Sequence, residues 1–475
     1  MSRPESDDNF AMSNVGISFG SPTSGQGFDV SSTVAAMVAN LQAVETPWKN
    51  QLTSLQAQDT AFTSIGTDLS SLSTALSSLT DVDGSFSQME GSSSDTSVVD
   101  LTSANAGAIP GTYGVVVSQL AQSYSYASSA IAAADTLSGT LSINGQSITI
   151  SDGTATDGNG NTIPENDTLS TLASYINAGD YGVTATVVSG SSGSQLALLS
   201  DTSGASGAVT IDASGLTDST SGSGVTFAQR QQGQDAVFSV DGVSMTDASN
   251  TITTGIPGVT MQLLQASPSE SVQVEIATDN SQVESAVDSF VSAYNTVIGD
   301  LNTQEGNDSS GSPEPLYGNP NVAMMQEQLQ EALTVVQASG AITSLSQLGI
   351  TANDDGTLTL DNSTLDSALT SNYQDAVNFF QASGSFGSTL TTTLGNLGNT
   401  GPDGLIYLAL QQDSTEESGL NTNITNENNV ISADQAQLTT ELNEANDTLQ
   451  EIPTQIDEVD ELYSAVTGYD ENPQG

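Results

Sequence analysis

Apolar residues recur at helical spacing near both ends of the chain, whereas the middle follows a different pattern. Between Val34 and Leu79 the apolar positions advance by three, four or seven residues, which keeps them in one stripe along a helix. This first stripe consists of Leu41, Trp48, Leu52, Leu55, Phe62, Ile65, Leu69, Leu72, Leu76 and Leu79. Near the C-terminus a second stripe consists of Leu438, Leu442, Ala445, Leu449, Ile452, Ile456, Val459, Tyr463 and Val466. A narrow apolar stripe in water needs a partner, so we predict coiled-coil arms that pair with each other, with other copies of the chain, or with both.

The middle of the chain, from about 81 to 277, alternates short runs of Val, Ile, Thr and Tyr with turns rich in Gly, Asn, Asp and Ser. This alternation predicts one or two β-rich domains. The dipeptides Asn144-Gly145 and Asp241-Gly242 each stand between apolar alternations and predict tight hairpins. The segment 169–177 is the one helix predicted in this region.

Helical periodicity resumes near Ser281, and a second helix is predicted at about 322–336. A hairpin is expected around Asp355-Gly356, followed by short helices at 364–369 and 375–381. The C-terminal arm is then expected to begin after a Gly-rich passage and to run to about residue 468.

Proline interrupts both arms. Pro47 predicts a short leading helix, capped by Asp29, Ser31 or Ser32, and a longer helix that resumes near Trp48. Pro453 lies inside the C-terminal arm, where it should kink the arm or divide it into two helices.

The pattern as a whole predicts an α+β multidomain fold, in which the terminal helices pair as a coiled-coil or helical-bundle leg and β-rich head domains are inserted between them. We divide the chain into five parts. They are 1–45, a terminal segment that is disordered or forms a coiled coil on assembly; 46–80 plus 281–450, the helical leg; 81–125 plus 232–280, a β-rich head domain; 126–231, a second β-rich head domain inserted in the first; and 451–475, a C-terminal coiled-coil segment.

Composition narrows the function classes. Three basic residues stand against 56 acidic ones, which gives a net charge of -53, so the chain cannot build a surface that neutralises phosphates. We therefore expect no nucleic-acid partner and no binding to anionic membranes. No apolar stretch is long enough to span a membrane, and the start of the sequence lacks the pattern of a signal peptide. A surface so acidic repels its own copies at neutral pH and low salt, which suggests acidic or saline surroundings outside the cell.

The chain has no Cys and no His, which removes the usual nucleophiles, general bases and transition-metal ligands. Asp354 and Asp355 could act as paired carboxylates, but they fall at a predicted turn, where Asp is favoured for backbone reasons. Asp157, Asn159 and Asn161 have the initial spacing of a calcium loop, yet the loop lacks its glycine and its final Glu. We predict no catalytic, cofactor or metal site, and we take the two stripes as the candidate functional residues.

Five segments carry a resemblance to a known family. SGQGFDVSSTVAAMV contributes Gly25, Gly27, Asp29, Val30, Val34 and Val38, and PGTYGVVVSQLAQ contributes Gly111, Tyr113, Val115, Val117, Gln119, Leu120 and Ala121. DAVFSVDGVSMTDASNTITTGIPGVTMQLLQ and VDSFVSAYNTVIGDLN contribute Phe238, Asp241, Gly242, Asn250, Ile252, Pro257, Gly258, Val259, Leu263, Leu264, Phe290, Tyr294 and Asn295. LGITANDDGTLTLD contributes Leu348, Gly349, Ile350, Asp355, Gly356, Leu358 and Leu360. In order and spacing these segments resemble the bacterial flagellar filament cap family, flagellar hook-associated protein 2, while about 122–231 carries no family motif.

The resemblance implies a protein that caps the distal end of the flagellar filament, promotes ordered insertion of flagellin, prevents flagellin loss, and supports filament elongation and motility. It further implies export through the flagellar type III apparatus with a cytoplasmic chaperone, a homo-oligomeric ring that is commonly a pentamer, and contacts with flagellin and with the hook-filament junction proteins. The family's function needs no cofactor and no reaction, so we do not expect an enzyme.

Other readings of the sequence remain open. Another flagellar axial protein, such as flagellin or a junction protein, would also have paired helical ends and a variable centre. A surface adhesin could use the Ser/Thr-rich β centre to bind host or matrix glycans. A carboxylate-based glycosidase is the least favoured class, because it would need two acids in one cleft.

Overall fold

The computed structural model describes residues 27–398 and 401–468, and these divide into two compact units. The first, here called the helical unit, contains the described residues up to Leu76, Asp288–Ala368, and the described residues from Gln374 onward. The second, here called the head unit, contains Ser77–Val287 together with Leu369–Tyr373. Terminal helices on either side of a β-rich centre confirm the predicted α+β class. Most of the predicted N-terminal segment and the last residues of the C-terminal segment lie outside the described residues.

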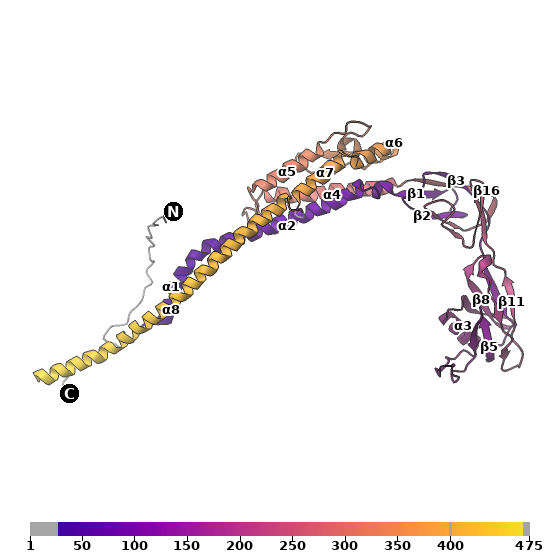
Figure 1. The fold of residues 1–475 in the computed structure, drawn as a ribbon, viewed down its shortest axis with the longest axis horizontal. Coiled ribbons are helices and arrows are strands. Elements are labelled where there is room, and N and C mark those ends of the chain that lie inside the picture. The colour runs from indigo at the N-terminus through magenta and orange to yellow at the C-terminus, as the bar shows by residue number, and fades with distance from the viewer. Residues whose placement is uncertain (1–26, 399–400, 469–475) are drawn as a thin grey trace. The chain divides into compact units, whose positions relative to one another are not determined.

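Seven long helices and one small hairpin contribute to the helical unit (Figure 1). The helices are α1 (Val30–Gln42), α2 (Thr46–Thr80), α4 (Asn280–Gln304), α5 (Pro320–Leu333), α6 (Asn362–Gln381), α7 (Phe386–Leu397) and α8 (Leu405–Thr467). The hairpin consists of β17 (Ile350–Ala352) and β18 (Leu358–Leu360), and Gly356 in its turn has a φ of 82°. This turn is the hairpin that the sequence predicts around Asp355-Gly356.

The first helices begin where the sequence predicts. The Asp29 side chain accepts a hydrogen bond of 3.1 Å from the Ser32 backbone N–H and so caps α1. A single 3-10 turn, Ala43–Glu45, separates α1 from α2, and Pro47 is the second residue of α2. Proline is tolerated there because the first N–H groups of a helix have no partner inside the helix.

Pro453 does not divide the C-terminal arm, which corrects that part of the prediction. Helix α8 runs without interruption from Leu405 to Thr467 with Pro453 inside it. Proline removes its own N–H and leaves the carbonyl of Leu449 without that donor. Residues around this point are largely exposed, so water can satisfy the carbonyl and the helix continues.

The two short helices predicted before α8 are confirmed. Both lie in α6, which consists of two helices on either side of a kink at Asn372 (φ -139°, ψ 38°). Helix α7 lies in a stretch that the sequence analysis treats as a Gly-rich passage. The signal for α7 is its buried apolar face of Phe386, Leu390, Leu394 and Leu397, which follows helical spacing despite the intervening Gly and Thr residues.

The first part of the head unit contains a five-stranded antiparallel sheet of order β1-β16-β3-β12-β13 and a three-stranded sheet of order β14-β15-β2. The strands are β1 (Met89–Ser93), β2 (Val99–Ala104), β3 (Gly111–Gln119), β12 (Ala236–Val240), β13 (Val243–Asp247), β14 (Thr251–Ile252), β15 (Val259–Leu263) and β16 (Ser267–Thr278). Alternating inward residues of both sheets form one core, which includes Val115, Phe238, Met261 and Val274.

The second part of the head unit has a separate core, in which α3 (Leu169–Ala178) packs on β7 (Val183–Gly190). Its other strands are β4 (Ser123–Ser128), β5 (Leu137–Ile143), β6 (Gln146–Thr149), β8 (Gly193–Ser203), β9 (Ile211–Asp212), β10 (Leu216–Asp218) and β11 (Phe227–Gln231). One sheet has the order β11-β4-β8-β7, and the other has β10-β5-β6 with β9 paired to β5. Leu172 and Ile176 of α3 contribute to this core and are fully buried.

Both predicted head hairpins are confirmed. Asn144 and Gly145 join β5 to β6 with φ of 50° and 79°, and Asp241 and Gly242 join β12 to β13 with φ of 49° and 81°. Two successive positive φ angles match the twist of the flanking strands. Asn and Asp tolerate this conformation better than other residues with a side chain, which is why the dipeptides carry the signal.

Candidate functional site: a helical assembly surface

The two ends of the chain meet where α1 lies along α8 (Figure 1). Val34, Val38 and Ile431 are buried at this contact, and four further apolar residues pack against them. These are Val30, Leu41, Leu438 and Leu442. At the start of α1, the Phe28 backbone N–H donates a 2.8 Å hydrogen bond to Asn446 Oδ1 on α8. Gly27 lies beside it, and a Cβ there would displace the Asn446 side chain that accepts this bond.

The structure places the predicted stripe residues in three environments. The buried ones all belong to α2 and are Leu55, Phe62, Ile65, Leu69, Leu72, Leu76 and Leu79. The half-buried ones are Leu41, Trp48, Leu52, Leu438, Leu442, Leu449 and Ile452. The exposed ones are Ala445, Ile456, Val459, Tyr463 and Val466. The two stripes thus differ in how far described residues cover them.

The last turns of α8 carry an uncovered apolar face, here called the α8 end face. It consists of Ile456, Val459, Leu462, Tyr463 and Val466, whose exposed fractions run from 40% to 79%. Helical spacing gathers these side chains along one side of the helix. Asp457, Glu458, Asp460 and Glu461 lie between them in the sequence and are also exposed. A contiguous apolar face with a polar rim is typical of a surface that binds another protein.

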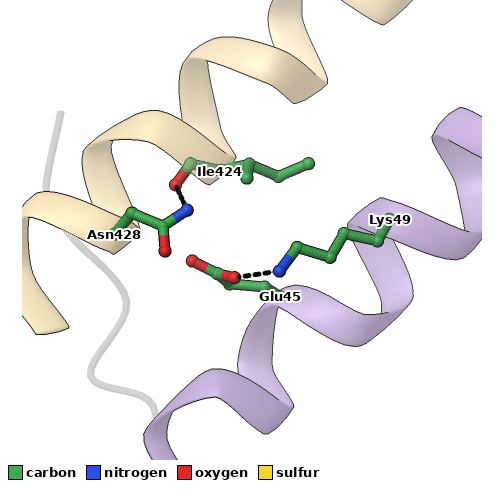
Figure 2. A network of polar contacts seen from close by, with 4 residues as sticks. All are labelled: Glu45, Lys49, Ile424 and Asn428. Carbon is green, nitrogen blue, oxygen red and sulfur yellow. Dashed lines mark hydrogen bonds and ion pairs between the residues drawn. The ribbon is translucent and has the colours of Figure 1, made fainter.

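An ion pair between the buried Glu45 and the exposed Lys49 lies at the junction between α1 and α2, and no sequence prediction included it (Figure 2). The Glu45 side chain is fully buried, and its Oε2 lies 2.6 Å from Lys49 Nζ. Across from it on α8, Asn428 Nδ2 donates a 2.9 Å hydrogen bond to the Ile424 carbonyl. Burying a carboxylate is costly unless a cation accompanies it. The available signal was the rarity of basic residues together with the spacing of one helical turn between Glu45 and Lys49.

The polar groups considered as chemical sites are engaged in local turns. Asp157 Oδ1 accepts hydrogen bonds from the backbone N–H groups of Asn159 (2.9 Å) and Asn161 (2.8 Å), and the bonds from Asn161 hold the pKa of Asp157 below its usual value. Asp355 Oδ1 likewise accepts from the Thr357 backbone at 3.0 Å. Within 27–398 and 401–468, no grouping of three or more acidic side chains could hold a metal ion. No helix in those ranges is long and apolar enough to cross a membrane.

Comparison with known proteins gives a consistent result. The family described as flagellar hook-associated protein 2 N-terminus matches residues 26–124, and the family described as flagellar hook-associated protein 2 C-terminus matches residues 233–468. The unmatched stretch between them coincides closely with the region in which the sequence shows no family motif. Both ends of the chain therefore match one kind of protein.

Curated relatives agree with the family matches, and a solved structure shares the fold. The chain is 27% identical over 308 residues to the B-type flagellar hook-associated protein 2 of Pseudomonas aeruginosa. This alignment covers 58% of this chain and 63% of that relative. The chain is also 27% identical over 383 residues to the A-type protein of Pseudomonas aeruginosa, which covers 74% of this chain and 78% of the relative. The match thus spans less than two thirds of the B-type relative. Among solved structures, the D1-D2-D3 domains of the flagellar cap protein FliD from Escherichia coli align with a TM-score of 0.52 and 24% identity, covering 74% of this chain and 99% of that one.

Proposed function

Because this chain belongs to the flagellar hook-associated protein 2 family, we propose that it caps the distal end of a bacterial flagellar filament and promotes the ordered insertion of flagellin beneath the cap. The membership agrees with the resemblance that the sequence motifs carry. A cap of this kind retains incoming flagellin and so supports filament elongation and motility. The family is a structural one, and we propose that the chain makes or breaks no bond.

The observation that carries the proposal is the α8 end face. Ile456, Val459 and Tyr463 remain exposed, although earlier residues of the same stripe, Leu438 and Leu442, pack against α1. An apolar face costs free energy in water, and its burial against another chain recovers about 25 cal/mol per Å². A subunit of a ring or a filament tip needs such a face, whereas a self-contained enzyme or binding domain does not.

The partners follow from this role. We propose a closed ring of copies of this chain, five in the family's common arrangement, in which the helical units form the legs and the head units form the plate. Flagellin and the hook-filament junction proteins are its proposed neighbours at the filament. We also propose export through the flagellar type III apparatus with a cytoplasmic chaperone, which places the protein at the flagellar tip.

The five-part division of the chain and the roles of the stripe residues are part of the same proposal. Buried stripe residues of α2, such as Leu69 and Leu72, would hold the leg together, whereas Val459 and Tyr463 would contact neighbouring chains. These two sets of residues should therefore respond differently to substitution.

Electron microscopy of the purified full-length chain tests the cap role. Closed small rings are the expected result, and long filaments of the chain alone would instead identify a flagellin-like protein. In a flagellin elongation assay, a Val459→Asp/Val466→Asp variant should fail to support growth. The matched control Thr454→Asp/Gln455→Asp adds the same two charges at exposed positions of the same helix. Equal loss of growth in both variants would refute the role of the α8 end face.

A further inference from the structure

Helix α2 carries two aspartates on opposite sides, and each faces an aspartate of another helix. Asp59 and Asp68 are nine residues apart. At about 100° per residue, this separation places them on opposite sides of the helix. Asp59 faces Asp413 of α8, and Asp68 faces Asp300 of α4. All four residues belong to the helical unit.

In the pair between α2 and α8, each aspartate has one buried oxygen without a hydrogen-bond donor among the described residues. Asp413 is 9% exposed, and no hydrogen bond from a described residue reaches Asp413 Oδ2 or Asp59 Oδ1. Two ionised carboxylates can only accept, so a proton on one of them is what makes a hydrogen bond between them possible. Burial, together with the charge of Asp59, raises the pKa of Asp413 to about 6.

The surroundings of Asp413 add negative charge and no positive charge. Glu416 and Glu417 follow on α8, and their charges also raise the pKa of Asp413. Gln51 of α2 donates from Nε2 to Glu416 Oε1, whereas Glu417 Oε1 is buried without a hydrogen-bond partner among the described residues. Within the part of the helical unit that the structure describes, the one cation, Lys49, is paired with Glu45.

A second pair of facing aspartates lies between α2 and α4, and both of its members, Asp68 and Asp300, are half-buried. Burial is the largest influence on Asp68, and the hydrogen bond with Asp300 and its charge add to it, so that the pKa of Asp68 rises to about 6. Asp300 is the titratable group that faces Asp68. The described residues include two cations: Lys49 is paired with Glu45, and Arg230 belongs to the head unit.

We propose that the Asp59–Asp413 and Asp68–Asp300 pairs form a proton-dependent clasp that ties α2 to α8 and to α4 in mildly acidic solution and loosens the helical unit as the pH rises. When each pair shares one proton, it forms a hydrogen bond across the helix contact. When both members of a pair are ionised, like charges oppose each other at partly buried positions. The clasp is thus engaged by acid and released by base.

The raised pKa values of Asp68 and Asp413 decide whether stability rises or falls with pH. The folded chain keeps a proton on Asp68 and on Asp413 up to about pH 6, whereas the unfolded chain loses it near the ordinary value of 3.8. Between these values the folded state binds more protons, so its stability falls as the pH rises. The stability that these two protons contribute is fully present below the ordinary pKa of aspartate, and it is lost above about pH 6.

The test compares melting temperatures of the full-length chain from about pH 4 to about pH 7.5. In Asp300→Asn/Asp413→Asn, the amides donate permanently to Asp68 and Asp59. This variant should melt higher than the unchanged chain at neutral pH and show a flatter dependence on pH. The control Asp288→Asn/Asp447→Asn removes two exposed acids from the same two helices. In this control, the melting temperature should depend on pH as steeply as in the unchanged chain.

Two outcomes would overturn the proposal. If the control variant flattens the profile as much as the test variant, general charge repulsion explains the dependence; if the test variant keeps the original slope, the pairs do not titrate as described. A second measurement needs no substitution. Carbon NMR of the aspartate carboxyl groups should show two of them titrating near pH 6 in the folded chain, and titration of every aspartate below about pH 5 would refute the clasp.

Discussion

Helices α2 and α8 carry the same kind of apolar stripe, yet the two stripes differ in how deeply they are buried. Phe62, Leu72 and Leu79 of α2 are at most 1% exposed, whereas Val459 and Tyr463 of α8 are 63% and 55% exposed. Periodicity shows that a helix has a face to bury, but it does not show what covers that face. The α2 stripe is a folding core, whereas the described residues leave the α8 end face uncovered.

The largest expected effect separates these two roles. Replacing Leu69 and Leu72 with Asp would place two charges among side chains that are 2% and 0% exposed. A buried unpaired charge costs several kcal/mol, so the helical unit should unfold and motility should be lost. Circular dichroism of the purified chain and a swimming assay measure the two consequences.

The control for this change lies on α8. Leu408→Asp adds a charge at a side chain that is already 49% exposed, so the fold should persist. A folded Leu69→Asp/Leu72→Asp variant with normal motility would show that the α2 stripe is not the core described here.

A smaller effect on stability is expected at the ion pair between Glu45 and Lys49. Lys49→Met removes the cation that accompanies Glu45 and leaves a carboxylate buried at the junction of α1 and α2. Lys49 is itself 55% exposed, so we expect a loss of about 1–2 kcal/mol in the free energy of unfolding, below the usual cost for a fully buried pair. Urea denaturation measures it. Glu45→Gln added to Lys49→Met should recover part of the loss, and a double variant less stable than Lys49→Met would argue against the pair.

Two glycine substitutions compare a covered part of α8 with an open one. Gly27→Ala should push Phe28 away from Asn446 and destabilise the start of α1 by about 1 kcal/mol. Gly419→Ala meets no atom within 4 Å in the interior of α8, so it should stabilise the chain by about 0.5–1 kcal/mol. Thermal melts of both variants give the comparison, and shifts of the same sign would contradict the described contact at Gly27.

The smallest effect is expected at the α8 end face. Val459→Asp alone should change the free energy of unfolding by less than about 0.5 kcal/mol, because no described residue covers that side chain. Urea denaturation of the dilute chain checks this value. A loss comparable with that of the α2 substitutions would mean that the face is already covered within one chain.

The sequence predicts those parts of the fold that depend on neighbouring residues. Asn144-Gly145 and Asp241-Gly242 specify their hairpins because few other residues accept two successive positive φ angles. Helix α7 was missed because Gly387 and Gly395 disfavour a helix locally, while packing of Phe386 and Leu390 in the tertiary structure outweighs that preference.

The site was less predictable than the fold, because its character depends on contacts between distant residues. The burial of Glu45 and the facing of Asp59 with Asp413 arise only when α8 packs beside α1 and α2. Spacing along the chain cannot reveal either. The prediction that Pro453 divides the helix was wrong for a related reason. Whether the helix continues depends on whether water reaches the carbonyl of Leu449, which the proline leaves without a donor.

The Glu45–Lys49 pair has a consequence for the speed of association. Lys49 is the one cation among the described residues of the helical unit, and its charge is already matched inside the chain. Two approaching copies therefore present only acids to each other around the α8 end face, and no long-range attraction guides their encounter. Added salt should raise the association rate constant by screening this repulsion, so that the ionic strength decides how fast copies of the chain meet.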